Sequence, residues 1–418
     1  MKINRWVSWG ILVFGFVIVF FHRLAIGSVA DQLMLDLNLD SVQIANLAAM
    51  TFYGYALMQL PVGIMVDTIG VRKICTIGMA VTAVGSFIFG FSHLIYLTYF
   101  ARLLVGIGTS VIIVSIMKLQ ATLFPKNMYS TLSGLTSLFG NFGAFFATIP
   151  LTYIALNFGW RDTFVILGII TVILSIAIFL FVKEQPQSGR GSRINIREGV
   201  KFVLTNKKNY PNFFIMVFFV GSLTAVLGLW GNGYLKTVYH MNGERAAYYL
   251  SFITYGFIVG APIVGKVSDL LGGEIKKILI FASSGYALLW LYILVIFKGQ
   301  PPVNQWSVIF FLMGIFMICH ILVFSNVKNV NPLKYTGIAI SVVNIGEFVG
   351  SGIISLSMGY LIKRLNASAY SSEEVFKIAM ILVLVSALLS FISVLFMNGK
   401  ENGNHIDIFP SLVKQKNI

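Results

Sequence analysis

Twelve long apolar segments dominate this sequence, and each can cross a membrane as a helix. A hydrocarbon core of about 30 Å needs about 20 apolar helical residues. The segments that meet this length are 6–30, 43–64, 71–92, 95–118, 130–153, 161–183, 210–235, 246–268, 276–298, 305–328, 336–362 and 374–398. Charged residues make up only 11% of the 418 positions, whereas a water-soluble domain carries about 25%. Because the apolar runs are continuous rather than alternating, we predict an all-α integral membrane protein and not a β-barrel.

The distribution of Lys and Arg predicts which ends of the spans face the cytoplasm. With both termini inside, cytoplasmic segments hold 21 of the 30 positive residues and external segments hold seven. The other two, Arg23 and Arg102, lie within spans. This excess follows the positive-inside rule, so we expect both termini in the cytoplasm. The net charge of +15 does not indicate nucleic-acid binding, because the positive residues lie in short loops between spans and form no basic groove.

The longest break between spans divides the chain into two sets of six. Within this break, 184–209, residues Ile196, Val200, Val203 and Leu204 recur at helical spacing. That spacing predicts a short amphipathic helix on the inner membrane surface, with a disordered linker as the alternative. The predicted organisation is an N-terminal six-helix bundle over 1–183, a cytoplasmic linker over 184–209, a C-terminal six-helix bundle over 210–398 and a cytoplasmic tail over 399–418.

A short motif recurs at equivalent places in the two halves. GIMVDTIGVRK at 63–73 follows the second span, and GKVSDLLGGEIKK at 265–277 follows the eighth. The Gly, Asp and Gly of the first copy return in the second at an offset of 202 residues. Glycine at a helix end lets the chain turn, and an Asp there can pair with a cation across the inner face. Asp67, Arg72 and Asp269 are therefore candidate gating residues, and the repeat indicates two homologous halves.

These motifs resemble those of the major facilitator superfamily over essentially the whole chain. RLLVGIG at 102–108 resembles the family's pattern in span four, and GWRDTF at 159–164 resembles the start of span six. FHRLAIGSVADQL at 21–33, LWGNGYL at 229–235 and NPLKYTGIAISVVN at 331–344 resemble bacterial members near the organic anion:cation symporters. The resemblance implies two six-helix bundles around a central cavity, alternating access and a place in the bacterial inner membrane.

Ionisable side chains inside spans are the strongest functional candidates, because each costs roughly 2.5–3.5 kcal/mol to insert. Glu347 lies about 15 Å into the eleventh span and is a candidate proton carrier, an ion-pair partner for an arginine or a ligand for a cationic group. Arg23 matches an arginine that binds substrate carboxylate in the symporters, which often have Asp before it where this chain has His22. The alternatives for Arg23 are snorkelling to the outer interface or pairing with Asp31. Arg102 either takes part in coupling or is a structural arginine beside the glycines of span four.

Polar and aromatic residues supply the remaining candidates for the cavity lining. The resemblance places the span-seven cluster of Trp230, Asn232 and Tyr234 beside the central cavity, with Gln59 as a weaker candidate on span two. A lone His such as His320 is more often a packed residue than a functional one. The predicted substrate-binding set is Arg23, His22, Tyr53, Trp230, Asn232, Tyr234 and Asn344. The predicted coupling and gating set is Glu347, Arg102, Asp67, Arg72 and Asp269.

No motif in the sequence indicates catalysis, a cofactor or a metal. The segment at 260–266 has the spacing of a phosphate-binding loop, but Val267 replaces the required Ser or Thr and the segment lies in an apolar run. HExxH, clustered Cys and His ligands and a Gly-x-Ser-x-Gly elbow are absent. We therefore expect no enzymatic activity.

The predicted function is secondary active transport of a small polar solute. An organic anion is the first candidate substrate, and a proton or another ion is the expected coupling partner. The alternatives are an amino acid or short-peptide transporter or facilitator, a drug exporter, and a solute receptor of the same fold that does not transport. We expect the protein to act as a monomer in the lipid bilayer.

Overall fold

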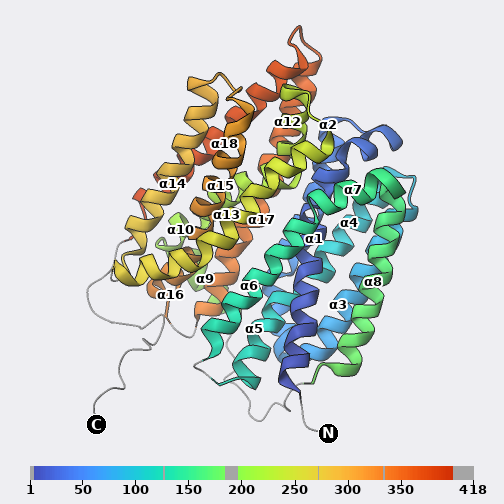
Figure 1. Cartoon of the computed structure of the whole chain (residues 1–418). Coiled ribbons are helices and arrows are strands. Elements are labelled where there is room, and N and C mark those ends of the chain that lie inside the picture. The colour runs from blue at the N-terminus through green and yellow to red at the C-terminus, as the bar shows by residue number, and fades with distance from the viewer. Residues whose placement is uncertain (1–3, 126–127, 184–195, 272, 333–334, 399–418) are drawn as a thin grey trace.

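The computed structural model is built from helices arranged in two bundles side by side (Figure 1). It describes residues 4–125, 128–183, 196–271, 273–332 and 335–398, so the predicted tail over 399–418 lies outside the described residues. Within the described part, twelve helical spans are long and apolar enough to cross a membrane, which confirms the predicted fold class. We call the end of the bundle at which α1 begins and α18 ends the terminal end, and the opposite end the distal end. That the terminal end is cytoplasmic stays a prediction from the charge distribution.

The N-terminal bundle contains six spans, the fourth and fifth of which are each built from two helices. Its elements are α1 (Arg5–Asp36), α2 (Ser41–Thr68), α3 (Val71–Phe91), α4 (Ile95–Thr109), α5 (Val111–Leu123), α6 (Tyr129–Phe146), α7 (Ile149–Phe158) and α8 (Trp160–Phe181). The Asp40 side chain caps α2 by accepting hydrogen bonds from the backbone N–H groups of Val42 and Gln43. Gly70, with φ +94°, makes the turn between α2 and α3 that the repeated motif predicts.

The C-terminal bundle repeats this plan with more irregular spans. Its elements are α10 (Asn209–Ile215), η2 (Met216–Val220), α11 (Gly221–Ala225), η3 (Val226–Trp230), α12 (Gly231–Tyr239), α13 (Gly243–Leu270), α14 (Ile275–Leu291), η4 (Tyr292–Ile296), η5 (Val303–Gln305), α15 (Trp306–Met317), η6 (Ile318–His320), α16 (Ile321–Val330), α17 (Thr336–Asn366) and α18 (Ser372–Leu395). The elements α10 to α12 form one continuous span in which η2 and η3 are π-helical turns. Such turns interrupt regular backbone bonding and often mark functional regions.

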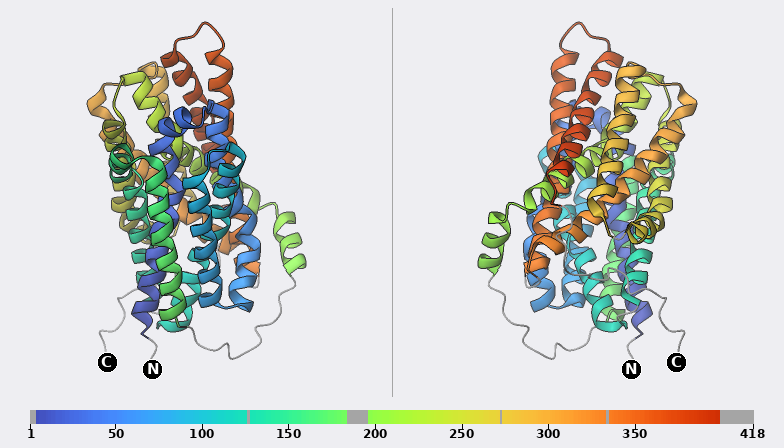
Figure 2. Two further views of the ribbon diagram at one scale, coloured as in Figure 1. Left: turned by 90° about the vertical axis from the view of Figure 1, so that its right-hand side faces the viewer. Right: turned by 90° about the vertical axis from the view of Figure 1, so that its left-hand side faces the viewer.

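The linker between the bundles contains a short helix, α9 (Ile196–Thr205), at the periphery of the molecule (Figure 2). Val203 on this helix is buried, and the ring of Phe202 lies 5.2 Å from the ring of Tyr335. The Tyr335 hydroxyl donates a hydrogen bond to Glu198 at 2.6 Å. The helix therefore rests on the residues just before α17. Residues 184–195 of the predicted linker lie outside the described residues.

Close contacts between glycines and facing backbones hold each bundle together. In the N-terminal bundle, a Cβ added to Gly54 of α2 would collide with the backbone of α4, and one added to Gly106 of α4 would collide with the backbone of α2. In the C-terminal bundle, Gly256 of α13 and Gly314 of α15 meet in the same way. Gly54 and Gly256 are separated by 202 residues, the offset of the repeated motif. Small residues let membrane helices approach closely. The two bundles are therefore packed through the same kind of glycine contact at equivalent positions.

The glycine contacts predict that two Gly→Leu substitutions will differ greatly in their effect on thermal stability. Gly256→Leu is expected to lower stability by about 1–3 kcal/mol or more, because a side chain must be forced between two packed backbones. Gly10→Leu is the matched control, because a Cβ on Gly10 meets nothing within 4 Å. Thermal unfolding in detergent, followed by tryptophan fluorescence, measures both variants. Equal losses of stability in the two variants would contradict the packing account.

Candidate functional site

An ion pair joins the two bundles in the interior of the protein. Nη1 of Arg23 on α1 donates to Oε1 of Glu347 on α17 at 3.0 Å. The two side chains are only 11% and 13% exposed. Arg23 lies about 27 Å along α1 from its first residue, and Glu347 lies about 17 Å along α17, so both are far from the helix ends. Of the alternatives for Glu347, the structure shows an ion pair with an arginine, and Arg23 neither pairs with Asp31 nor reaches the outer interface.

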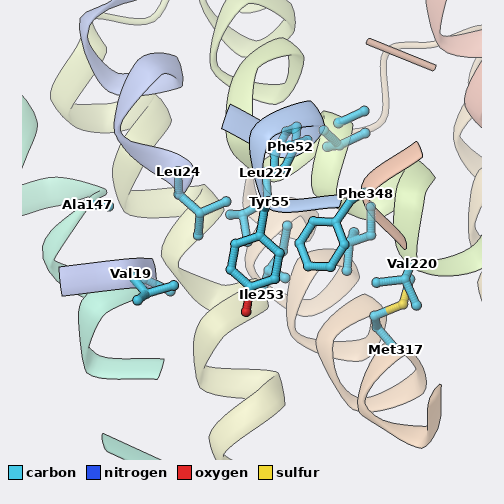
Figure 3. Close-up of a cluster of buried hydrophobic side chains, with 14 of the residues drawn as sticks. Val19, Leu24, Phe52, Tyr55, Ala147, Val220, Leu227, Ile253, Met317 and Phe348 are labelled. Carbon is cyan, nitrogen blue, oxygen red and sulfur yellow. The ribbon is translucent and has the colours of Figure 1, made fainter. Parts of the chain in front are cut away.

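Three aromatic rings surround the Arg23 guanidinium. Its central carbon lies 5.0 Å from the ring centroid of Phe20, 5.2 Å from that of Tyr55 and 5.0 Å from that of Phe348. Tyr55 of α2 and Phe348 of α17 stack across the boundary between the bundles, with centroids 4.3 Å apart (Figure 3). Guanidinium groups are attracted to the faces of aromatic rings. The cation is therefore held by rings from three helices as well as by the carboxylate.

Two further ion pairs join the bundles at the distal end. Lys236 of α12 pairs with Asp31 of α1, and Nζ of Lys363 on α17 lies 2.8 Å from Oδ2 of Asp40. Burial raises the pKa of the Asp40 carboxyl, but hydrogen bonds from Lys363 and from the backbone N–H groups that Asp40 caps bring the pKa below its usual value. Asp40 therefore stays ionised near neutral pH. We call these two pairs the distal ion pairs.

A cavity of about 670 Å³ lies between the bundles on the distal side of the central ion pair. Its lining includes Gly27, which is one turn along α1 from Arg23, and the side chains of both distal ion pairs. Trp230 and Asn232, two residues of the predicted substrate-binding set, also line it. Nε1 of Trp230 donates to the Ser355 carbonyl at 3.0 Å, which fixes the ring against α17. This cavity therefore lies at the level of the distal ion pairs, and neither Arg23 nor Glu347 is among the residues that line it.

The described contacts between the bundles run from the distal end to the level of the central ion pair. The Ser41 hydroxyl donates to the Gly359 carbonyl at 2.8 Å near the distal end. Deeper in the protein, the ring of Phe145 on α6 lies 6.1 Å from the ring of Tyr255 on α13. Toward the terminal end, α6 and α13 diverge (Figure 1). The bundles are thus joined on the distal side of the Arg23–Glu347 pair.

Three predicted site residues point into their own bundles instead. His22 is fully buried, with Nε2 3.2 Å from the Ser86 hydroxyl. Nη2 of Arg102 donates to the His22 carbonyl at 2.7 Å, and the Arg102 side chain is also fully buried. The Tyr234 hydroxyl donates to the Gly299 carbonyl. The structure does not bring these side chains to the central ion pair, and their contacts stabilise α1 against its neighbours and α12 against the loop before α15.

The other predicted residues lie at different levels of the molecule. Tyr53 is half-buried and packs against α17, and Asn344 is half-buried on α17 one turn from Glu347. Nε of Arg72 donates to a backbone carbonyl of α8 at 2.6 Å, so Arg72 ties α3 to α8 within one bundle. The side chains of Asp67 and Asp269 lie outside the described residues.

Sequence analysis missed the aromatic rings around Arg23 and the distal ion pairs. Asp31 and Lys236 are 205 residues apart in the sequence, so no local pattern connects them. The available signal was that charged residues lie just before span two and at the ends of spans one, seven and eleven, which the predicted topology places on the same side of the membrane. For the rings, the signal was the adjacency of Phe348 to Glu347 and the helical spacing of Phe20 from Arg23.

Comparison with known proteins decides the family. A family model described as Major Facilitator Superfamily matches residues 12–355. The chain belongs to the major facilitator superfamily. It is therefore a multi-pass membrane protein of a transporter family and not an enzyme, as the sequence predicted.

Relatives and solved structures agree with this assignment. The hexuronate transporter of Bacillus subtilis is 28% identical over 175 residues, which cover 41% of this chain and only 40% of that relative. The gentisate transporter of Corynebacterium glutamicum is 23% identical over 347 residues, covering 79% of this chain and 76% of the relative. The crystal structure of a D-xylose–proton symporter superposes with a TM-score of 0.74 at 15% identity, covering 94% of this chain and 97% of that one. The last likeness shows the fold alone.

The distal ion pairs predict that charge reversal will open the distal end. Lys236→Glu places two carboxylates together where a pair existed, and we expect the equilibrium to shift toward the distal-open state by roughly tenfold, or about 1.4 kcal/mol. Spin labels at Tyr96 and Tyr370, which are 82% and 52% exposed, report the separation of the two bundles at that end. The inter-label distance should lengthen in Lys236→Glu and return in the double variant with Asp31→Lys. An unchanged distance in the single variant would show that the pair does not hold the bundles together.

Proposed function

We propose that this chain carries small organic anions across the membrane, with Arg23 binding the carboxylate and Glu347 taking up a proton. The observation that carries the proposal is the Arg23–Glu347 ion pair. It places one cation and one titratable acid at the boundary between two bundles that move relative to each other in this family's fold. The carboxylate chemistry of hexuronate and gentisate, named for two relatives, supports an anionic substrate.

Arg23 has the chemistry to anchor a carboxylate. A guanidinium stays charged at any physiological pH and offers parallel N–H donors that match the two oxygens of a carboxylate. In the structure, one of these donors is engaged by Glu347. An incoming substrate carboxylate can take the place of Glu347, because both present a carboxylate group with two acceptor oxygens.

The displacement of Glu347 supplies the coupling step. A carboxylate that loses its counter-charge in a low-dielectric interior is destabilised by several kcal/mol. Protonation removes that cost, so the arrival of an anion at Arg23 favours the uptake of a proton by Glu347. When the substrate leaves, Arg23 recovers Glu347 and the proton is released. The substrate and the proton therefore cross together, and the net charge between the bundles stays constant.

The same ion pair supports a second candidate, transport of a zwitterion such as an amino acid. A ligand with a carboxylate and an ammonium group could insert between Arg23 and Glu347 and pair with both. In that case Glu347 binds the substrate directly and no proton is required. Glu347 takes up a proton in the first candidate and stays ionised to pair with the ammonium group in the second. Glu347→Gln therefore distinguishes the two candidates.

The anion proposal predicts that Arg23 is indispensable for ligand binding. At a hundredfold excess over Kd, a bound anion stabilises wild-type protein by about 2.7 kcal/mol. We expect Arg23→Lys to retain only part of this stabilisation, because it cannot bind bidentately, and Arg23→Gln to lose it. Thermal unfolding with a panel of organic acids measures the effect. Full anion-induced stabilisation of Arg23→Gln would exclude Arg23 as the anchor.

The coupling step predicts a split phenotype for Glu347→Gln. The amide imitates a protonated carboxyl, so the variant should still bind the anion and exchange labelled for unlabelled anion between the two sides of a liposome. It should lose accumulation driven by an imposed pH gradient. If the substrate is a zwitterion, Glu347→Gln instead loses binding and exchange. Wild-type protein that binds a solute but shows no exchange would be a receptor and not a transporter.

A further inference from the structure

The surroundings of Arg23 narrow the chemistry of the substrate. We infer that the site accepts planar aromatic monocarboxylates in preference to sugar acids and dicarboxylates. This inference rests on the proposed function, because it assumes that Arg23 binds a carboxylate. It adds the chemical class of the part of the substrate that carries the carboxylate.

The number of cations argues for a single carboxylate. Among the side chains that the structure describes at the boundary between the bundles, Arg23 is the cation at the central level. Arg102 points into its own bundle, and Lys236 and Lys363 are held in the distal ion pairs. Asp31, the partner of Lys236, is eight residues beyond Arg23 on α1, or about 12 Å. A small dicarboxylate anchored on Arg23 would leave its second charge without a partner, which is strongly unfavourable away from water.

The side chains beside Arg23 suit a flat apolar body. Phe20, Tyr55 and Phe348 present three rings within about 5 Å of the guanidinium. Aromatic rings attract one another in offset or edge-to-face arrangements. A carboxylate on the guanidinium edge therefore brings an attached ring next to these three. A sugar acid places a hydroxyl on nearly every carbon, and each hydroxyl that leaves water needs a polar partner.

Polar side chains near the pair are few. Gln59 lies one turn from Tyr55 on α2 and is only 5% exposed. His320 engages the Met317 carbonyl through Nδ1 at 2.8 Å. Few polar groups are thus available to the hydroxyls of a sugar acid.

Binding of matched acids to purified full-length protein tests the inference. Benzoate, cyclohexanecarboxylate, glucuronate and glucarate are compared by thermal shift and by competition in exchange assays. We expect benzoate to bind about tenfold more tightly than cyclohexanecarboxylate, which has the same charge and similar size but no aromatic face. Glucuronate and glucarate should bind more weakly than either.

Substitutions then assign the preference to residues. Phe348→Leu should reduce the ratio of benzoate to cyclohexanecarboxylate affinity to near one, and Phe348→Tyr should restore it. Phe91→Leu is the matched control, since that ring is 67% exposed at the end of α3 and should leave this ratio unchanged.

The outcomes separate this inference from the proposed function. If glucuronate or glucarate binds more tightly than benzoate and that binding is lost in Arg23→Gln, the anion carrier stands and the aromatic preference is wrong. If no acid depends on Arg23, both proposals are wrong. If a preference for benzoate survives Phe348→Leu in a variant with wild-type thermal stability, the rings around Arg23 do not set it.

Discussion

A charge pair in a low-dielectric interior is stable only while both partners stay together, and this protein places its two partners on different helical bundles. Separating Arg23 from Glu347 would leave two buried charges, at a cost of several kcal/mol for each. The pair therefore resists movement until something replaces one partner. In the proposed function, an anion on Arg23 and a proton on Glu347 do this together, so that coupling would follow from electrostatics without a separate mechanical link.

The remainder of the structure concentrates movement at the boundary between the bundles. Glycines bring α2 against α4 and α13 against α15 at backbone distance, so each bundle behaves as a packed unit. Arg102 and His22 add buried hydrogen bonds inside the first unit. Across the boundary, the contacts are side chains that can exchange partners: the distal ion pairs, the central pair and the stack of Tyr55 on Phe348. A rearrangement of these contacts can occur without unfolding of either bundle.

The sequence was sufficient to predict the fold, because membrane insertion imposes a length and a polarity that can be counted along the chain. It also identified Arg23 and Glu347, since an ionisable residue within an apolar span is conspicuous. It could not predict that they pair, because Glu347 is 324 residues from Arg23 and either could have met another partner. His22 was grouped with Arg23 only because the two residues are adjacent in the sequence. On a helix, adjacent residues face directions about 100° apart, and the His22 side chain points into its own bundle.

The number of protons taken up when an anion binds tests the central claim most directly. An organic acid that the protein binds is adjusted to the same pH and mixed with purified protein in weakly buffered detergent solution near neutral pH. A pH indicator records the change in proton concentration. The account predicts uptake of about one proton for each anion bound in the wild type, and none in Glu347→Gln at the same occupancy. Binding of an anion to wild-type protein without proton uptake would show that Glu347 stays charged, and that its displacement from Arg23 is not the coupling step.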